Sequence, residues 1–102
     1  MKNIFISGIS RGIGYATAKH LSMKHNIFGS TRDKNAFLHN PSNSFIIQDN
    51  LFEIDFLKNN TKAELDMILQ PVQDKIQVLI NNAGVVIFTP YEKSVLEDLK
   101  TQ

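Results

Sequence analysis

The sequence predicts an α/β fold in which a parallel β-sheet is doubly wound, with helices covering both of its faces. Short apolar runs alternate with helical patterns along the chain, and a glycine-rich turn follows the first run. The last clear run, Ile76–Ile80, is almost continuously apolar, which is typical of a strand buried on both faces. Because strands that alternate with helices pair in parallel through right-handed crossovers, we expect about four parallel strands with flanking helices.

The first strand and the first helix enclose a turn that can hold an anion. Ile4–Ile6 is rich in β-branched residues, Gly8, Gly12 and Gly14 follow it, and a helical pattern runs from Gly12 to Lys24. The first turn of a helix leaves backbone N–H groups without intrahelical acceptors and carries partial positive charge. Glycines let the backbone approach a ligand closely and tolerate positive φ. This segment therefore predicts a phosphate-binding strand and helix.

The middle of the chain predicts a second strand, a short helix and two candidates for the third strand. Asn26–Thr31 has the composition of a strand, and Asn35–His39 can form a short helix before a cluster of turn formers. Phe45–Ile47 and Leu51–Ile54 are both strand-like, and only one of them is expected to join the sheet. The spacing to the later strand favours Leu51–Ile54.

A further helix and strand complete the alternation. Lys58–Gln70 carries apolar residues at helical intervals, with Asn60 or Thr61 as a candidate N-cap. Ile76–Ile80 then predicts the fourth strand, and another helix is expected to start at Ser94.

Composition restricts the classes of function. The chain has 102 residues, of which 42% are hydrophobic, and no apolar run reaches the roughly 18 residues of a membrane span. No secretory signal pattern is present, so we expect a cytoplasmic location and no membrane partner. The chain has no cysteine, and its histidines lack ligand partners at helical spacing, so we expect no metal site. Its basic residues are scattered, so nucleic acid is not an expected partner.

Two motifs resemble the short-chain dehydrogenase/reductase family. The family's T-G-x-x-x-G-x-G fingerprint appears as Ser7–Gly14, with Ser in the Thr position, and its N-N-A-G motif appears unchanged as Asn81–Gly84. Each motif follows a predicted strand, and the resemblance covers essentially all 102 residues. It implies a Rossmann-like sheet in which residues 1–102 form the N-terminal dinucleotide-binding part of an oxidoreductase.

The resemblance implies where the cofactor's phosphates and adenosine ribose would bind. The segment Gly8–Gly14 would cradle the pyrophosphate, with Ser10 and Arg11 over the adenosine ribose. Arg11, together with Arg32 after the second strand, resembles the NADP-preferring members, because a 2′-phosphate suits guanidinium groups. Asp33 keeps NAD as the minority alternative, since a carboxylate in this region can accept hydrogen bonds from a ribose hydroxyl.

The remaining cofactor contacts are also implied by position in the family pattern. Asp55 best matches the aspartate that reaches the adenine, with Asp49 as the runner-up. Asn81, Ala83 and Gly84 would line the ribose on the nicotinamide side, whereas Asn82 has at most a structural role. The full set of predicted cofactor residues is Gly8, Ser10, Arg11, Gly12, Ile13, Gly14, Thr31, Arg32, Asp55, Asn81, Ala83 and Gly84.

No catalytic residue can be assigned. The family uses a Ser, a Tyr and a Lys in a Y-x-x-x-K arrangement on later elements, and the resemblance supplies none of them here. Tyr15 and Lys19 have this spacing, but they lie in the phosphate-loop helix, where we expect Tyr15 to serve packing or the surface. The chain is therefore expected to be the cofactor half of an NADP-linked alcohol or carbonyl oxidoreductase, truncated before its catalytic half. The alternative is a non-catalytic nucleotide-binding module or a relic without activity. In either case we expect a small-molecule substrate to be bound only by a full-length parent protein.

Overall fold

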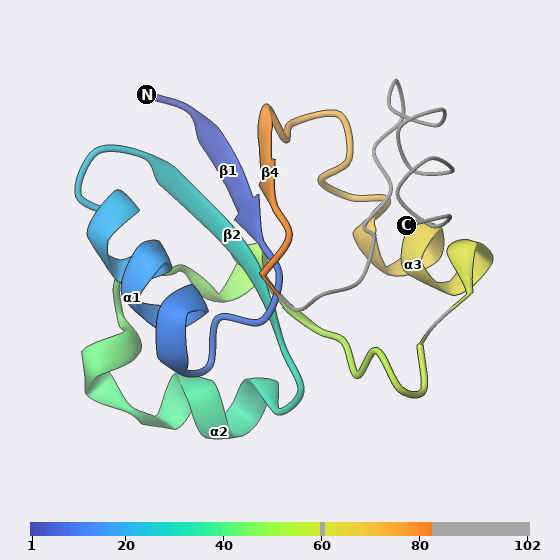
Figure 1. The fold of residues 1–102 in the computed structure, drawn as a ribbon, viewed down its shortest axis with the longest axis horizontal. Coiled ribbons are helices and arrows are strands. Elements are labelled where there is room, and N and C mark those ends of the chain that lie inside the picture. The colour runs from blue at the N-terminus through green and yellow to red at the C-terminus, as the bar shows by residue number, and fades with distance from the viewer. Residues whose placement is uncertain (60, 83–102) are drawn as a thin grey trace.

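The computed structural model describes residues 1–59 and 61–82, which form a four-stranded, all-parallel sheet (Figure 1). The strands are β1 (Asn3–Ile6), β2 (Asn26–Thr31), β3 (Leu51–Glu53) and β4 (Val78–Ile80), and their spatial order is β3-β2-β1-β4. The chain starts in the centre of the sheet and moves outward to one edge before it crosses to the other. This arrangement confirms the predicted Rossmann-like α/β fold.

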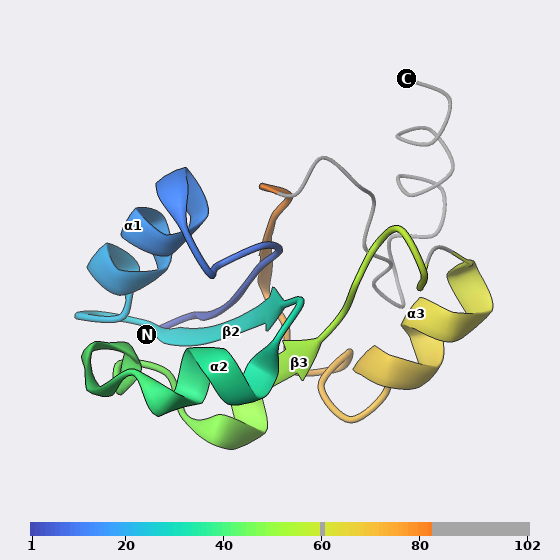
Figure 2. The ribbon, with the colours of Figure 1, turned by 90° about the horizontal axis from the view of Figure 1, so that it is seen from below.

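Helices cover both faces of the sheet. Helices α1 (Gly12–Leu21) and α2 (Lys34–His39) lie on one face, and α3 (Lys62–Leu69) lies on the other (Figures 1 and 2). Two short 3₁₀ turns, Pro41–Asn43 and Gln48–Asn50, connect α2 to β3. The sheet is therefore doubly wound, as the alternation of apolar runs predicts.

Successive strand residues point into two separate cores. Ile4 and Ile6 of β1 face α1 and α2, whereas Phe5 between them faces α3. The core under α1 and α2 consists of Ile4, Ile6, Ile9, Ala18, Ile27, Phe37, Ile46 and Leu51, and the core under α3 of Phe5, Phe28, Ile54, Leu65, Leu69, Val72 and Ile76. Because both faces of the central strand are covered, Ile4, Phe5 and Ile6 of β1 are all apolar rather than alternating with polar residues.

The third strand is the second of the two candidates. Leu51–Glu53 pairs in parallel with β2, with Leu51 opposite Gly29, while Phe45–Ile47 forms no strand. Ile46 is buried in the core under α1 and α2 instead. This apolar run therefore contributes to the core without forming a strand. Its sequence pattern alone does not distinguish these two possibilities.

Two helices are shorter than their patterns predict. Helix α1 ends at Leu21 rather than Lys24. The helical pattern of α3 extends back to Lys58, but the helix begins at Lys62, directly after Thr61, one of its two candidate N-caps. The segment before α3 is a tight turn in which the Asn59 N–H donates to the carbonyl of Asp55. The backbone groups of this turn hydrogen-bond to one another, so the helix starts only after the turn. The helix predicted from Ser94 lies outside the described residues.

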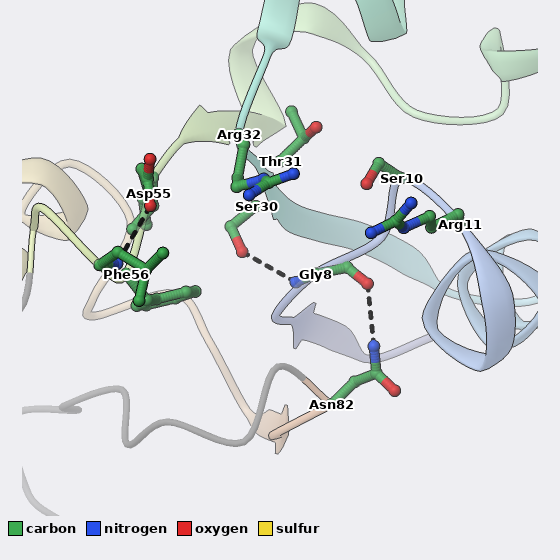
Figure 3. Close-up of a pocket in the computed structure, with 11 residues that line it drawn as sticks. Gly8, Ser10, Arg11, Ser30, Thr31, Arg32, Asp55, Phe56 and Asn82 are labelled. Atoms are coloured by element: carbon green, nitrogen blue, oxygen red, sulfur yellow. Dashed lines mark hydrogen bonds between the residues drawn. The ribbon is translucent and has the colours of Figure 1, made fainter.

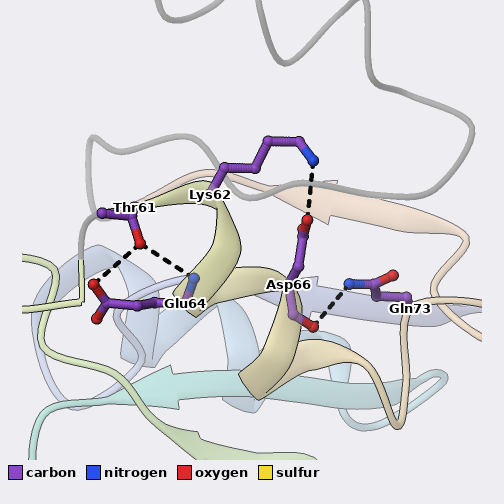
Figure 4. Close-up of polar contacts among 5 residues, drawn as sticks. All are labelled: Thr61, Lys62, Glu64, Asp66 and Gln73. Atoms are coloured by element: carbon purple, nitrogen blue, oxygen red, sulfur yellow. Dashed lines mark hydrogen bonds and ion pairs between the residues drawn. The ribbon is translucent and has the colours of Figure 1, made fainter.

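Thr61 is the N-cap of α3. Its hydroxyl accepts from the Glu64 N–H at 3.2 Å and donates to a Glu64 carboxylate oxygen at 3.0 Å, so residues 61 and 64 are joined by two hydrogen bonds (Figure 4). Further along the helix, Lys62 and Asp66 form an i, i+4 ion pair with a 3.0 Å separation. The Gln73 amide donates to the Asp66 carbonyl at 3.1 Å and joins the following turn to α3. In the part of the chain that the structure describes, no helix is long and apolar enough to cross a membrane.

Candidate functional site

A cleft of about 440 Å³ opens where the carboxyl ends of the parallel strands meet (Figure 3). Every strand contributes to it through the loop that follows or through its last residues. The residues that line it are Gly8, Ser10, Arg11, Ser30, Thr31, Arg32, Ile54, Asp55, Phe56, Leu57 and Asn82. In open α/β sheets this edge is where ligands bind, at the point where the strand order reverses. Here the strand order reverses between β1 and β4, and the loop that contains Gly8 follows β1.

Gly8 is held from two sides by side chains of neighbouring strands. Its N–H donates to the Ser30 hydroxyl at 2.9 Å, and its carbonyl accepts from the Asn82 amide at 2.9 Å (Figure 3). Gly8 and Gly12 have φ of 68° and 66°, a region that residues with a Cβ rarely adopt. The loop is therefore fixed in one conformation by hydrogen bonds to β2 and to the end of β4.

Gly14 allows the first turn of α1 to lie against this loop. A Cβ at Gly14 would collide with the carbonyl oxygen of Gly8 and with the side chain of Asn82. Because the main collision is with backbone, a rotamer change could not relieve it. The third glycine is thus needed for close packing, whereas Gly12 is needed for its backbone conformation.

The N-terminus of α1 lacks a protein cap in the part of the chain that the structure describes. Arg11 is the N-cap residue and makes no side-chain capping bond, and the first turn contains no acidic residue. The first bond of the helix runs from the Tyr15 N–H to the Arg11 carbonyl at 3.4 Å. The N–H groups before it, at Gly12 and Ile13, are oriented as donors, and the helix dipole adds positive potential.

Two guanidinium groups add full positive charge to the cleft. Arg11 lines it from the glycine-rich loop and Arg32 from the end of β2, and both are exposed (Figure 3). Within residues 1–59 and 61–82, neither forms a hydrogen bond through its side chain or an ion pair. Asp55 is the one carboxylate among the lining residues. The site therefore suits an anion of more than one negative charge.

The acidic residues near the cleft have different environments. Asp55 lines it, and one of its carboxylate oxygens accepts from the Leu57 N–H at 3.0 Å. Asp49 lies elsewhere, in a groove beside β3, so Asp55 is the one of these two aspartates that lines the cleft. Asp33 does not line the cleft and caps α2 by accepting from the Ala36 N–H at 3.0 Å. One oxygen of its exposed carboxylate is therefore bound within the protein.

The predicted cofactor residues divide into four groups by where the structure places them. Thr31 is buried and lines the cleft, as do Gly8, Ser10, Arg11, Arg32 and Asp55. Gly12, Ile13 and Gly14 form the adjoining first turn of α1, where Ile13 is 79% exposed although it is apolar. Asn81 lies beside the cleft without lining it, and its side-chain oxygen accepts from the Ser7 hydroxyl at 3.2 Å. Ala83 and Gly84 fall outside the described residues.

Ser30 is a site residue that the motifs do not predict, and Asn82 lines the cleft as well as having the structural role expected of it. The side chains of both residues hold Gly8. A hydroxyl in the next-to-last position of a strand is the signal for Ser30, but it is a weak one because Ser is common at strand ends. The asparagine pair after β4 marks the position of Asn82 without telling which of the two contacts the loop.

Tyr15 serves packing, as expected. Its ring makes edge contacts with Phe37 and Phe45 at centroid distances of 6.4 and 5.7 Å, and its hydroxyl donates to Asn43 at 2.8 Å. Lys19 lies 5.9 Å from the centre of the same ring. Tyr15 packs against the core under α1 and α2, Lys19 is exposed, and neither residue lines the cleft.

Neither a metal site nor a similarity to known proteins assigns a function to the cleft. The described residues contain no group of three or more side chains that could hold a metal ion. No protein-family model matches the sequence, and no curated protein matches it either. The function must therefore be inferred from the two motifs and from the geometry of the cleft.

Proposed function

We propose that the cleft binds a nicotinamide dinucleotide, with NADP(H) preferred over NAD(H). The resemblance to short-chain dehydrogenases/reductases suggests this ligand class. The observation that carries the proposal is a pair of guanidinium groups that have no partner among the described residues. Arg11 lies in the glycine-rich loop at the N-terminus of α1, and Arg32 follows β2 across the cleft. A backbone anion site and two arginines together suit a ligand that has both a pyrophosphate and a separate phosphate monoester.

The donor groups of the cleft fit such a ligand. The N–H groups at the start of α1, next to Gly8 and Gly12, would hold the pyrophosphate. Arg11 and Arg32 would hold the 2′-phosphate, and Asp55 would contact the adenine. The cleft volume of about 440 Å³ lies in the usual range of small-molecule sites, about 300–1,000 Å³.

The proposed parent reaction is the oxidation or reduction of an alcohol or carbonyl compound. When bound, the nicotinamide supplies or accepts a hydride. The described residues would bind and orient the dinucleotide, and no Tyr–Lys pair of theirs faces the cleft. That last observation favours a second candidate, a nucleotide-binding module that transfers no hydride by itself. Turnover of a panel of carbonyl compounds with NADPH by this chain would refute the second candidate.

Calorimetric titration of the chain with NADPH and NADH tests the binding proposal. We expect Arg11→Ala and Arg32→Ala each to weaken NADPH binding about tenfold or more, because each removes a charge-assisted hydrogen bond of about 1.5–3 kcal/mol. NADH binding should change little. Lys24→Ala is the matched control, since it removes one positive charge from the residues after α1, away from the cleft.

Two results would contradict the proposal. One is the absence of binding of either nucleotide at millimolar concentration to a folded protein. The other is equal binding of NADPH and NADH that neither arginine substitution alters.

A further inference from the structure

The turn that carries Arg32 is fixed by contacts on both of its sides. Before it, the carbonyl of buried Thr31 accepts from the Ile54 N–H at 2.9 Å, which ties the end of β2 to β3. After it, Asp33 is the N-cap of α2 and its carboxylate accepts from the Ala36 N–H at 3.0 Å. The single exposed residue between these two fixed points is Arg32.

A second carboxylate holds the same turn from the neighbouring strand. A carboxylate oxygen of Glu53, the last residue of β3, accepts from the Lys34 N–H at 3.0 Å. The Phe37 N–H donates to the Asp33 carbonyl at 3.1 Å, and the Phe37 ring is buried in the core under α1 and α2. Acidic side chains thus satisfy two of the N–H groups that the start of α2 would leave without partners.

These contacts assign the charge of Asp33 to the protein rather than to a ligand. A carboxylate that binds a ribose 2′-hydroxyl must face the cleft, and Asp33 is not among the residues that line it. Turning it toward the cleft would break the bond to Ala36 and remove the cap from α2. Arg32, one residue earlier, does line the cleft and has no competing partner among the described residues.

We propose that Asp33 is a positioning residue that selects the 2′-phosphorylated cofactor through Arg32. By capping α2 it fixes the turn in which Arg32 faces the cleft, so the arginine is oriented before the ligand arrives. An acidic residue that could be taken as a mark of NAD binding thereby supports preference for NADP(H). This inference rests on the proposed function and adds a specificity role for a residue outside the contact set.

Two substitutions separate the cap from the charge. Asp33→Asn keeps a side-chain oxygen that caps nearly as well as aspartate, whereas Asp33→Ala removes both the cap and the charge. Asp74→Asn is the control, because this exposed carboxylate lies in the turn after α3 and does not line the cleft. The full chain and each variant are titrated with NADPH and with NADH by calorimetry, and protection of the Ala36 amide is followed by hydrogen exchange.

The cap role predicts different results for the two variants. Asp33→Ala should weaken NADPH binding about fivefold, since the fraction of molecules with Arg32 in place falls when the cap is lost. Asp33→Asn should bind NADPH as tightly as the parent or about threefold tighter, because it removes a negative charge near the phosphate. NADH affinity should stay within about twofold in both, since NADH offers Arg32 no phosphate monoester. Only Asp33→Ala should lose protection at Ala36.

Three outcomes would overturn the inference. A tenfold loss of NADH affinity in Asp33→Asn would show direct contact with the ribose. Equal NADPH affinities for Asp33→Asn and Asp33→Ala, with Ala36 protection lost only in the latter, would show that the cap does not control Arg32. Absence of binding of both nucleotides to the parent chain would refute the proposed function itself, and the selectivity role with it.

Discussion

All four strands of the parallel sheet start at one side of it, here called the amino edge, and end at the other, the carboxyl edge. Both of these edges are polar, but their polar groups have different partners. At the amino edge, the Asn3 side chain accepts from Asn26 at 3.0 Å and donates to the Lys75 carbonyl at 3.0 Å, and its N–H donates to Gln77 at 2.9 Å. The Lys2 N–H donates to the His25 ring at 3.0 Å. At this edge the starts of β1, β2 and β4 are joined by hydrogen bonds within the protein.

At the carboxyl edge, internal hydrogen bonds fix the backbone but leave the strongest donors available. Ser30 and Asn82 hold Gly8, while the guanidinium groups of Arg11 and Arg32 have no partner among the described residues. A polar edge that satisfies itself contributes stability, and one that retains oriented, unsatisfied donors can bind an anion. The two edges therefore differ in whether their hydrogen-bond donors have acceptors within the protein, rather than in how polar they are.

The largest effect is expected at Gly14, where the carboxyl edge depends on close packing. Gly14→Ala should lower the free energy of unfolding by about 2–3 kcal/mol, because its Cβ would collide with the Gly8 carbonyl. Urea unfolding measures this loss. Gly12→Ala is the matched comparison, since a Cβ there meets nothing within 4 Å, and strain at positive φ should cost about 1–2 kcal/mol. Equal losses for the two variants would show that the loop can move away from α1.

Asn3→Ala tests whether the amino edge serves stability alone. The substitution removes the side-chain bonds to Asn26 and Lys75, and we expect a loss of about 1–2 kcal/mol in unfolding free energy. NADPH affinity of the folded fraction should not change. A tenfold weaker affinity in this variant would mean that the two edges are coupled and would contradict the comparison.

Ser30→Ala, at the carboxyl edge, should weaken nucleotide binding, which Asn3→Ala should leave unchanged. It leaves the Gly8 N–H without its acceptor and should cost about 1 kcal/mol of stability. NADPH and NADH should both bind more weakly, because both rely on the same loop. Retention of the parent affinity for both nucleotides would show that the bond from Gly8 to Ser30 does not set the conformation of the loop.

The smallest effect is expected at α3, which belongs to neither edge. Thr61→Ala removes the capping bond to Glu64 and should cost about 0.5–1 kcal/mol in thermal or urea unfolding. Thr61→Ser should restore most of it. Nucleotide affinity should stay at the parent value, which separates a general loss of stability from a specific loss at the cleft.

The sequence predicted the sheet well because its two central strands are buried on both faces. The apolar residues Ile4–Ile6 and the strand-like segment Asn26–Thr31 form β1 and β2 in parallel register. It could not exclude Phe45–Ile47 as a strand, since an apolar run that packs as an irregular segment has the same composition. The start of α3 was predicted as one of two candidates, because Asn60 and Thr61 are both residue types that cap helices, and the structure selects Thr61.

The site shows the same division between local and distant information. The Gly8 loop and Arg32 follow strands, so their position at one edge could be predicted from a parallel sheet alone. The role of Ser30 could not, because its partner Gly8 lies 22 residues away, in the loop that follows another strand. The cap that Asp33 provides was visible in principle as an acidic residue before a helix, but the carboxylate was equally suited to a ribose.

Mapping of amide chemical shifts during titration with NADPH tests the central claim most directly, because both edges are observed in one experiment. We predict large shifts at the carboxyl edge, in the Gly8 loop, the first turn of α1 and the residues around Arg32 and Asp55. Amides at the amino edge, around Asn3 and Asn26, should remain unperturbed. Titration with NADH should reproduce the shifts of the Gly8 loop but not those around Arg32. Shifts centred on the amino edge, or none at all in the folded chain, would contradict the assignment of the carboxyl edge as a dinucleotide site.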